Sequence, residues 1–254
     1  MSKGTVLLMI TMFLLLLSCQ LESPQSSQSA TSKVEKKTNK PPIPNTLTER
    51  EKKEGWQLLF DGKSLEYWKG YNLDGKLPTS WNVRDGIIIG RGKDNIITKE
   101  TYQNFELRLD FNLSEAANSG IFYFAKELPE KAIYQSAPEY QLVDNQTYLD
   151  KQGADIMHKH LTGDAFNLYD GIINPAIRHG KWYQALIRHK DGHVEHWLNE
   201  KLCIEYDWDS EDWKEKVANT AFDPTIFGTT NNGHIGLQGW GNDIQFRNIK
   251  IRRL

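Results

Sequence analysis

The sequence has 254 residues, and 31 Lys and Arg against 33 Asp and Glu give a formal charge of -2 at pH 7. Apolar residues make up 39% and charged residues 25%, which permits a hydrophobic core and excludes a wholly disordered chain. The near-neutral balance gives no electrostatic footprint for nucleic acid. Two cysteines, Cys19 and Cys203, exclude a disulfide framework and a cysteine-rich zinc module.

The first nineteen residues predict a lipoprotein signal peptide, residues 1–19. Lys3 precedes an apolar run over residues 6–17. A bilayer crossing needs roughly 20 apolar residues, so the run is too short to span but suits a signal-peptide core. It ends at Cys19 in the sequence Leu-Leu-Ser-Cys, which resembles a bacterial lipobox. The alternative is an ordinary secretory signal with a chance cysteine. We expect lipidation of Cys19, and hence anchoring to a membrane of the cell envelope, at the periplasmic or outer-membrane surface.

The next segment, residues 20–49, is expected to be a disordered tether. It is rich in Ser, Gln, Lys, Thr and Pro and has almost nothing apolar to bury. All tryptophans and tyrosines lie after residue 55, so the folded domain is expected over 50–254. Within it, Cys203 lies in an apolar alternation that favours a buried small hydrophobe over a nucleophile.

Strand patterns dominate the predicted domain. Residues 105–113 alternate apolar and polar without a break, which predicts a strand with one buried and one solvated face. Further strands are expected at 87–89, 121–124, 182–187, 193–206, 235–237 and 244–251. The segment 193–206 is expected to fold as a hairpin about Asn199-Glu200. The apolar parity of the last strand changes near Arg247-Asn248, which predicts a β-bulge.

One short helix is expected near residues 210–219. Asp209-Ser210 forms a candidate N-cap, acidic residues occupy the first turn, and Trp213 and Val217 share one face. Many short strands separated by Gly, Asn and Asp turns predict an all-β fold, a sandwich of the jelly-roll type.

Polar residues concentrate in an otherwise strand-like segment, residues 134–145. Glu139 and Gln141 face the same side of a regular strand, whereas Asp144 would face the other side. A bulge near Val143 would bring the aspartate beside them. The spacing E-x-Q-x-x-D would then place two carboxyl groups and an amide on one concave surface, as glycosidic chemistry requires. An ordinary exposed strand edge is the alternative.

Histidines and aromatics add further candidates. His158 and His160, with a carboxylate of the preceding segment, are weak candidates for a divalent-cation site, and no metal is assigned. His196 shares the parity of apolar neighbours, which is more typical of a core histidine than of a base. Aromatic rings offer flat contact area to the apolar faces of sugars. Trp240 lies between two glycines and is the best candidate for such a platform, whereas Trp56, Trp68 and Trp81 lie in core-like patterns.

These segments together resemble the 3-keto-disaccharide hydrolase domain, in order, from about residue 55 to the C-terminus. The matching motifs include Gly55-Trp-Gln-Leu-Leu-Phe-Asp-Gly, Asn118-Ser-Gly-Ile-Phe, Ala137-Pro-Glu-Tyr-Gln-Leu-Val-Asp-Asn, Leu168-Tyr-Asp, His193-Val-Glu-His-Trp-Leu-Asn and Gly236-Leu-Gln. The resemblance implies a concanavalin A-like β-sandwich with its site on the concave sheet, carried on an exported bacterial lipoprotein.

The resemblance also implies an activity, the cleavage of glycosides oxidised at C3. A ketone at C3 acidifies the C2 proton, so a base can remove it and the glycosidic oxygen leaves by elimination. It further implies a catalytic set of Glu139, Asp144 and His196. The resemblance implies that Gln141, Tyr169, Asp170 and Gln238 bind the carbohydrate substrate, and Trp240 joins them as the aromatic platform expected from its glycine neighbours.

Three positions depart from the common pattern of the family. Phe124 stands where many members have arginine, and Gly239 and Trp240 replace an aspartate and a histidine. Two alternatives therefore stay open beside the enzyme for 3-keto-glycosides. One is a non-catalytic glycan-binding module on the cell surface, and the other is a conventional retaining glycosidase of the laminarinase type.

Overall fold

The computed structural model describes residues 43–153, 157–171 and 177–254. The predicted signal peptide, Cys19 and nearly all of the predicted tether lie outside these residues. Within them, no helix combines the length and the apolar composition that crossing a membrane requires.

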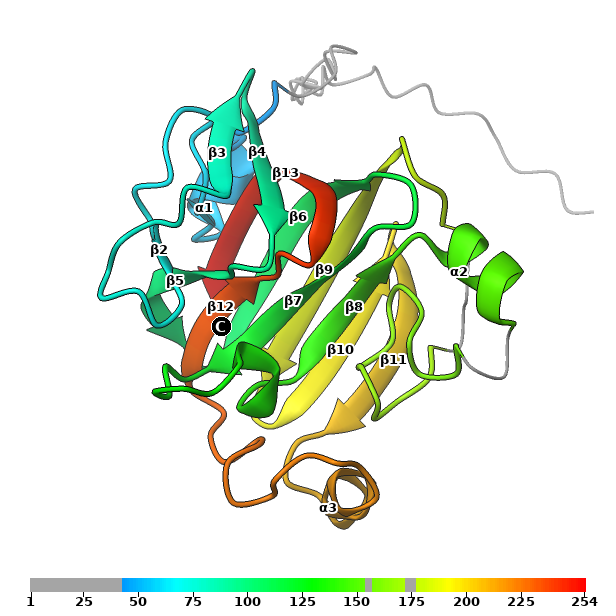
Figure 1. Cartoon of the computed structure of the whole chain (residues 1–254). Helices are drawn as coiled ribbons and strands as arrows, with labels where there is room; N and C mark the ends of the chain where they lie inside the picture. Colours follow the sequence, from blue (N-terminus) through cyan, green and yellow to red (C-terminus); the bar gives the residue numbers. More distant parts are fainter. Residues whose placement is uncertain (1–42, 154–156, 172–176) are drawn as a thin grey trace, which may run out of the picture. The chain divides into compact units, whose positions relative to one another are not determined.

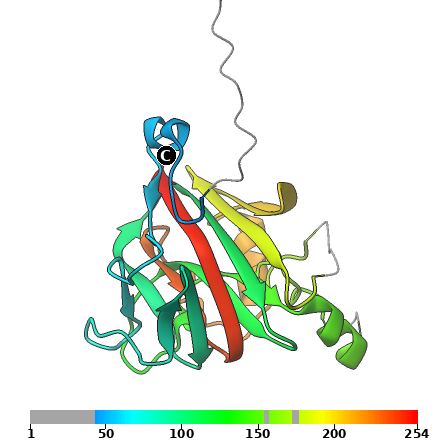
Figure 2. The same ribbon diagram turned by 90° about the horizontal axis from the view of Figure 1, so that it is seen from above.

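The described residues form two antiparallel sheets that pack face to face, as Figures 1 and 2 show. The larger sheet has the strand order β11-β10-β9-β6-β13-β4-β3, with β1 pairing with β13, and the smaller has the order β2-β5-β12-β7-β8. The strands of the larger sheet are β1 Gln57–Leu58, β3 Trp81–Arg84, β4 Ile87–Gly92, β6 Phe105–Leu113, β9 Trp182–Lys190, β10 His193–Leu198, β11 Lys201–Asp207 and β13 Gly241–Arg253. Those of the smaller sheet are β2 Trp68–Gly70, β5 Ile96–Tyr102, β7 Asn118–Ala125, β8 Glu139–Val143 and β12 Gly233–Leu237. The predicted all-β sandwich is confirmed.

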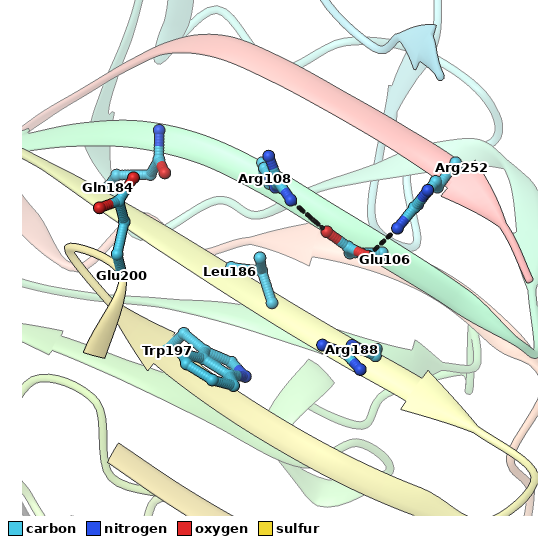
Figure 3. Close-up of a pocket in the computed structure, with 8 residues that line it drawn as sticks. All are labelled: Glu106, Arg108, Gln184, Leu186, Arg188, Trp197, Glu200 and Arg252. Carbon is cyan, nitrogen blue, oxygen red and sulfur yellow. Dashed lines mark hydrogen bonds and ion pairs between the residues drawn. The ribbon is translucent and has the colours of Figure 1, made fainter. Parts of the chain in front are cut away.

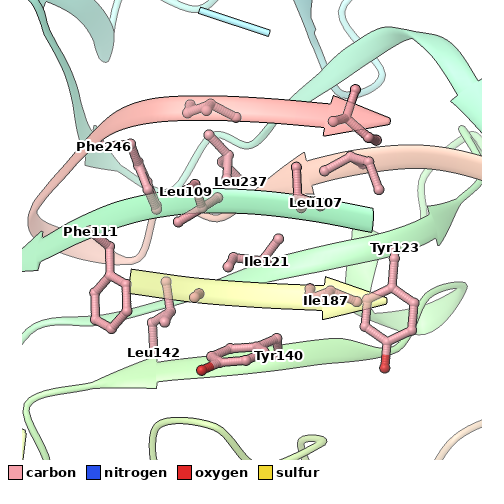
Figure 4. Packing of buried hydrophobic residues seen from close by; sticks show 14 of the residues in the cluster. Leu107, Leu109, Phe111, Ile121, Tyr123, Tyr140, Leu142, Ile187, Leu237 and Phe246 are labelled. Atoms are coloured by element: carbon pink, nitrogen blue, oxygen red, sulfur yellow. The ribbon is translucent and has the colours of Figure 1, made fainter. Parts of the chain in front are cut away.

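The core lies between the sheets and follows the period of two that the sequence contains. The odd-numbered residues of β6 point inward and are at most 1% exposed. From the other sheet, Ile121 and Tyr123 of β7 and Tyr140 and Leu142 of β8 meet them (Figure 4). Since alternate residues of a strand point to opposite faces, the neighbours of Tyr140 must lie on the outer face of the smaller sheet.

Two local features of the larger sheet agree with the sequence pattern. The strands β10 and β11 form the expected hairpin, and both turn residues, Asn199 and Glu200, have positive φ angles of 46° and 65°, as a tight type I′ turn requires. The register of β13 against β6 shifts between Arg247 and Lys250, so the predicted bulge is present.

Helices are short, and one of them was expected. The helix α3 (Glu211–Ala218) has Ser210 as its N-cap and buries Trp213 and Val217, as predicted. The helices α1 (Glu49–Lys53) and α2 (Asn145–Gln152) and the 3₁₀ turn η1 (Ile133–Gln135) were not expected. None of the α1 residues is buried, and α2 buries only Asn145. Neither helix therefore carries the apolar stripe by which a helix is recognised.

The ordered domain begins before residue 50. Asn45 exchanges two hydrogen bonds with Asn248, at 2.7 and 2.8 Å, and its side-chain amide donates to the Gly86 carbonyl. Thr48 then caps α1 in a capping box with Glu51. The last residues of the predicted tether are thus part of the folded unit. Polar contacts hold them there, and a count of apolar residues does not detect such contacts.

Candidate active site

The centre of the candidate site is the outer face of the smaller sheet at β7. Gly120 pairs with Gln141 of β8, and on its other side its carbonyl accepts the Gln238 amide at 3.0 Å. The strands β7 and β8 and the residue that follows β12 therefore place a glycine between two glutamines on one face. Because Gly120 has no side chain, the Glu139 carboxyl group of the neighbouring strand can lie directly over it.

The walls are completed by a loop that pairs with the free edge of β8. Gln141 donates its amide to the Asp164 carbonyl at 3.0 Å and accepts from the Gly163 amide at 3.1 Å. Two residues earlier, the Glu139 carbonyl accepts from the Phe166 amide at 3.0 Å. This pairing sets the phenylalanine ring beside the glutamate.

A cavity of about 190 Å³ lies on this face of the sheet, beside the Glu139 carboxyl group. Three aromatic rings, two glutamines, one asparagine and one glutamate line it, namely Tyr134, Phe166, Trp240, Gln141, Gln238, Asn118 and Glu139. Trp240 is 51% exposed, and the Lys93 ammonium group lies 5.9 Å from the centre of its ring. Flat rings around a few inward polar groups suit a sugar ring, whose faces are apolar and whose edges carry hydroxyls.

Three buried acceptors in this cavity have no hydrogen-bond partner among the residues that the structure describes. They are Oε1 of Glu139, Oδ1 of Asn118 and Oε1 of Gln238. An unsatisfied buried acceptor costs about 1–3 kcal/mol, so buried polar atoms are normally paired. Acceptors gathered in one hollow therefore indicate a ligand rich in donors, and sugar hydroxyls supply them.

Glu139 carries the one carboxyl group among the residues that line the cavity. Its side chain is 5% exposed, and burial raises its pKa well above the ordinary glutamate value. No cation in the lining offsets this effect. A carboxyl group of raised pKa is a stronger base once ionised than an exposed one.

The predicted place of Asp144 is wrong. The register of β7 and β8 continues without a shift from Phe122–Glu139 to Asn118–Val143, so the expected bulge near Val143 is absent. Asp144 lies beyond the strand and is fully buried.

The partners of Asp144 explain why it stays there. Its Oδ2 accepts hydrogen bonds from the Ala116 amide at 3.1 Å, the Thr147 hydroxyl at 2.6 Å and His179 Nδ1 at 2.9 Å. Burial acts to raise the pKa of Asp144, but these bonds outweigh it and hold the pKa below the ordinary value. The carboxylate anchors the start of α2 and is not among the residues that line the cavity.

The expectation that His196 joins the catalytic set is also wrong in its geometry. The side chain is fully buried between the sheets, as its apolar parity indicates. Nδ1 lies 3.2 Å from the Gly163 carbonyl, and Nε2 lies 2.9 Å from the Tyr123 hydroxyl. Since a carbonyl only accepts, Nδ1 carries the proton and Nε2 accepts from the tyrosine. Desolvation lowers the pKa of His196 to about 3, so the ring is neutral.

Tyr169 and Asp170 lie apart from the cavity. Tyr169 stacks on Tyr206 at 4.6 Å and donates its hydroxyl to Asp212 of α3 at 2.7 Å. Asp170 accepts the Lys159 amide at 2.6 Å and pairs with His158 Nδ1 at 3.0 Å. Both hold the loop that borders β8, and neither is among the residues that line the cavity.

The histidine candidates for a cation do not converge. His160 Nε2 lies 2.6 Å from Asn167 Oδ1, and His158 pairs with Asp170 as described. Over the described ranges, no three His, Cys, Asp or Glu residues come together as metal ligands would.

The positions that depart from the family pattern have structural explanations. Phe124 has a φ of 62° at a register shift of β7 against β12, and its ring packs in the core instead of facing the cavity. At Gly239 a Cβ would lie 2.5 Å from the Asp94 carbonyl oxygen. A larger residue would therefore require the backbone to move, whereas Trp240 next to it reaches the cavity.

Sequence reasoning missed three residues of the cavity: Asn118, Tyr134 and Phe166. Two of them reach the site from loops or turns, whose direction no periodicity encodes. The signal that could have located Asn118 is its place two residues before Gly120, since both then share the outer face of one strand.

Comparison with known proteins agrees with this geometry. A family model described as "3-keto-alpha-glucoside-1,2-lyase-like domain" matches residues 55–252. A protein of Bacteroides thetaiotaomicron named "3-keto-disaccharide hydrolase" is 32% identical over 232 residues, which are 79% of each chain. Two crystal structures of candidate glycosyl hydrolases from Parabacteroides distasonis are similar. One has a TM-score of 0.75 at 33% identity, over 84% of this chain and 100% of the other. The second has a TM-score of 0.63 at 28% identity, over 78% and 99%.

Proposed function

Because the chain belongs to the 3-keto-alpha-glucoside-1,2-lyase-like domain family, we propose that it cleaves the glycosidic bond of sugars oxidised to a ketone at C3. The observation that carries the proposal is Glu139, a buried carboxyl group with an unpartnered oxygen in a hollow walled by aromatic rings. This combination suits a base that acts on a sugar ring held by stacking.

The proposed reaction begins with removal of the C2 proton by Glu139. The ketone at C3 acidifies that proton, and the electron pair is delocalised onto the ketone oxygen. The pair then forms a C1–C2 double bond while the bond from C1 to the glycosidic oxygen breaks, and the leaving oxygen takes up a proton. Addition of water across the double bond, with its hydroxyl at C1 and its proton at C2, completes a net hydrolysis.

The amide side chains that line the cavity are suited to bind the substrate during this reaction. An amide side chain offers both a donor and an acceptor. The donors of Asn118, Gln141 and Gln238 are suited to hold the ketone oxygen as negative charge develops, and the unpartnered oxygens are suited to accept from ring hydroxyls. Preorganised neutral donors in a hollow without competing charges stabilise an enolate more than water does.

A conventional retaining glycosidase is disfavoured by the same cavity. That mechanism needs two carboxyl groups about 5–5.5 Å apart across the sugar. Glu139 is the one carboxyl group among the residues that line the hollow, and Asp144 is engaged elsewhere. A non-catalytic glycan-binding module stays as the second candidate, because Trp240 is an exposed aromatic platform.

The test compares a 3-keto-glucoside with the unoxidised glucoside in deuterated water. We expect turnover of the keto sugar only, with deuterium at C2 of the product. Turnover should fall about 10²–10⁴-fold in Glu139→Gln, whereas the exposed control Glu205→Gln should keep wild-type activity. Binding without turnover in the wild type would establish the glycan-binding module, and full activity in Glu139→Gln would remove the glutamate from the mechanism.

We also propose that the protein is exported and anchored by acylation of Cys19, on the strength of the sequence at residues 1–19. Labelling of cells with a radioactive fatty acid should mark the full-length protein. The Cys19→Ser variant should be unlabelled and released from membranes. Labelling that survives this substitution would contradict the anchor.

A further inference from the structure

A second hollow, of about 290 Å³, lies on the outer face of the larger sheet and is drawn in Figure 3. It is lined by three arginines, two glutamates, a glutamine, a leucine and a tryptophan: Arg108, Arg188, Arg252, Glu106, Glu200, Gln184, Leu186 and Trp197. We call it the arginine groove. It belongs to the opposite sheet from Glu139, so it is a separate site.

The strand register explains how the groove is built. Glu106 of β6 lies directly opposite Arg252 of β13 on one side and Arg188 of β9 on the other. One row further along, Leu186 of β9 lies opposite Trp197 of β10. On its other side Leu186 lies opposite Arg108 of β6, so this second row joins two apolar side chains to an arginine on the same face.

Glu106 holds two of the arginines in fixed positions. It is 3% exposed and lies between Arg108 and Arg252 (Figure 3). Oε1 accepts from Nε and Nη2 of Arg108 at 3.1 and 2.6 Å, and Oε2 accepts from Nη2 of Arg252 at 2.6 Å. Guanidinium groups held in this way lose little side-chain entropy when they bind a ligand.

Donors remain unused in the groove. Nε of Arg188 and Nε of Arg252 are buried and have no hydrogen-bond partner in the described part of the chain. Besides the bond to Glu106, Arg252 lies 5.1 Å from the centre of the Trp56 ring and its Nη1 lies 4.0 Å from Glu54, while Arg188 Nη1 lies 3.4 Å from Glu195. The cavity at Glu139 has unpaired acceptors, which suit a ligand with donors. This groove has unpaired donors, which suit a ligand with acceptors.

The ligand must therefore carry acceptors and a flat apolar face. Guanidinium groups bind carboxylates through paired N–H donors. Trp197 is half-buried, and its Nε1 donates to Glu195 at 2.6 Å, which fixes the plane of the ring. With Leu186 it offers apolar contact area beside the arginines, and Gln184 and Glu200 provide polar groups at the other end (Figure 3).

We propose that the arginine groove binds an acidic sugar residue, with its carboxylate on Arg188 and Arg252 and its ring against Trp197. This site would hold a uronate-containing glycan while the opposite sheet acts on another sugar. The inference does not depend on the reaction proposed for Glu139.

The test is calorimetric titration of the full-length protein with tetragalacturonate, with cellotetraose as the uncharged control. We expect binding of the acidic oligomer that weakens as salt is raised, and at least tenfold weaker binding of cellotetraose. Arg188→Met keeps the aliphatic stem but removes the donors, so its dissociation constant should rise about tenfold or more. Trp197→Ala should have a similar effect.

Two control variants separate the possible causes. Arg91→Met removes an exposed arginine that pairs with Asp243 outside the groove, and Glu139→Gln changes the other site. Both should bind tetragalacturonate as the wild type does, and melting temperatures should verify that each variant folds. The proposal is overturned if the wild type fails to bind at millimolar concentration, or if Arg188→Met binds normally. Equal binding of cellotetraose would also overturn it. If inorganic sulfate binds as tightly with the same dependence on Arg188, the groove is a simple anion site and the assignment to a sugar is wrong.

Discussion

Gly120 and Glu139 are coupled by space: a Cβ atom at residue 120 would lie 2.6 Å from Cδ and from Cγ of the glutamate. The carboxyl group of one strand thus occupies the room that the neighbouring strand leaves by having a glycine. Because real Cβ contacts are longer, any larger residue at 120 must displace the carboxyl group. The glycine is therefore part of the site, although it has no functional group of its own.

This coupling predicts the effect of Gly120→Ala. The added methyl group should push the Glu139 carboxyl out of place, and a misplacement of about 1 Å can cost about a hundredfold in rate. We expect kcat on a 3-keto-glucoside to fall about a hundredfold while the fold is kept. The shorter carboxylate of Gly120→Ala/Glu139→Asp should recover part of that loss. An active Gly120→Ala variant would show that the position of the carboxyl group is not critical.

The pH dependence of stability gives a second prediction. Burial raises the pKa of Glu139, so the folded state binds a proton that the unfolded state releases above about pH 4.5. The stability that this group contributes is complete below that pH and is lost as the pH rises through the raised pKa, by about 1.4 kcal/mol for each pH unit between the two values.

Glu139→Gln should remove this loss, because its amide does not ionise. Urea unfolding between pH 4.5 and 8 should show the wild type losing stability relative to the variant as the pH rises. Glu205→Gln changes an exposed glutamate and should follow the wild type at each pH. Parallel curves for the wild type and Glu139→Gln would mean that the carboxyl group is not desolvated.

Much of the fold could be predicted because strand alternation is a local pattern. The nine residues of β6 alternate in sequence and in the structure, and the parity change in β13 marks the bulge that the register contains. The sequence pattern does not predict that the domain begins before residue 50, because Asn45 is held by Asn248, a residue 203 positions away. Such a pairing leaves no trace in composition.

The site could be predicted in part for the same reason. Glu139 and Gln141 share a face because they are two residues apart on one strand, and that prediction is confirmed by the cavity that both line. Asp144 required a bulge, and an irregularity of that kind depends on what lies beyond the strand. Here the Ala116 amide, Thr147 and His179 bind the carboxylate and fix its position. Gln238 and Trp240, which follow β12, reach the cavity as expected.

Trp240 supports a third prediction, which concerns binding more than catalysis. Its ring is half-exposed at the rim, so Trp240→Ala removes a stacking surface without opening the core. We expect KM for a 3-keto-glucoside to rise about tenfold, in line with about 1 kcal/mol for an aromatic contact, and kcat to stay near the wild-type value. Tyr67→Ala, at an exposed tyrosine outside this cavity, should change neither value. An unchanged KM in Trp240→Ala would place the substrate elsewhere.

Asp144 gives the prediction that separates structure from chemistry. The carboxylate accepts three hydrogen bonds while fully buried, so Asp144→Asn should lower the free energy of unfolding by about 3 kcal/mol, since bonds to a charged group contribute about 1.5–3 kcal/mol each.

Because its pKa is held below the ordinary aspartate value, the stabilisation by Asp144 is present above that value and is lost as the pH falls through the lowered pKa. The wild type should therefore approach the stability of Asp144→Asn in strong acid. On the folded fraction at low temperature, kcat of Asp144→Asn should stay within about twofold of the wild type, in contrast to Glu139→Gln. If Asp144→Asn keeps its stability but loses its activity, Asp144 takes part in the reaction, because only contact with the substrate would then explain the effect.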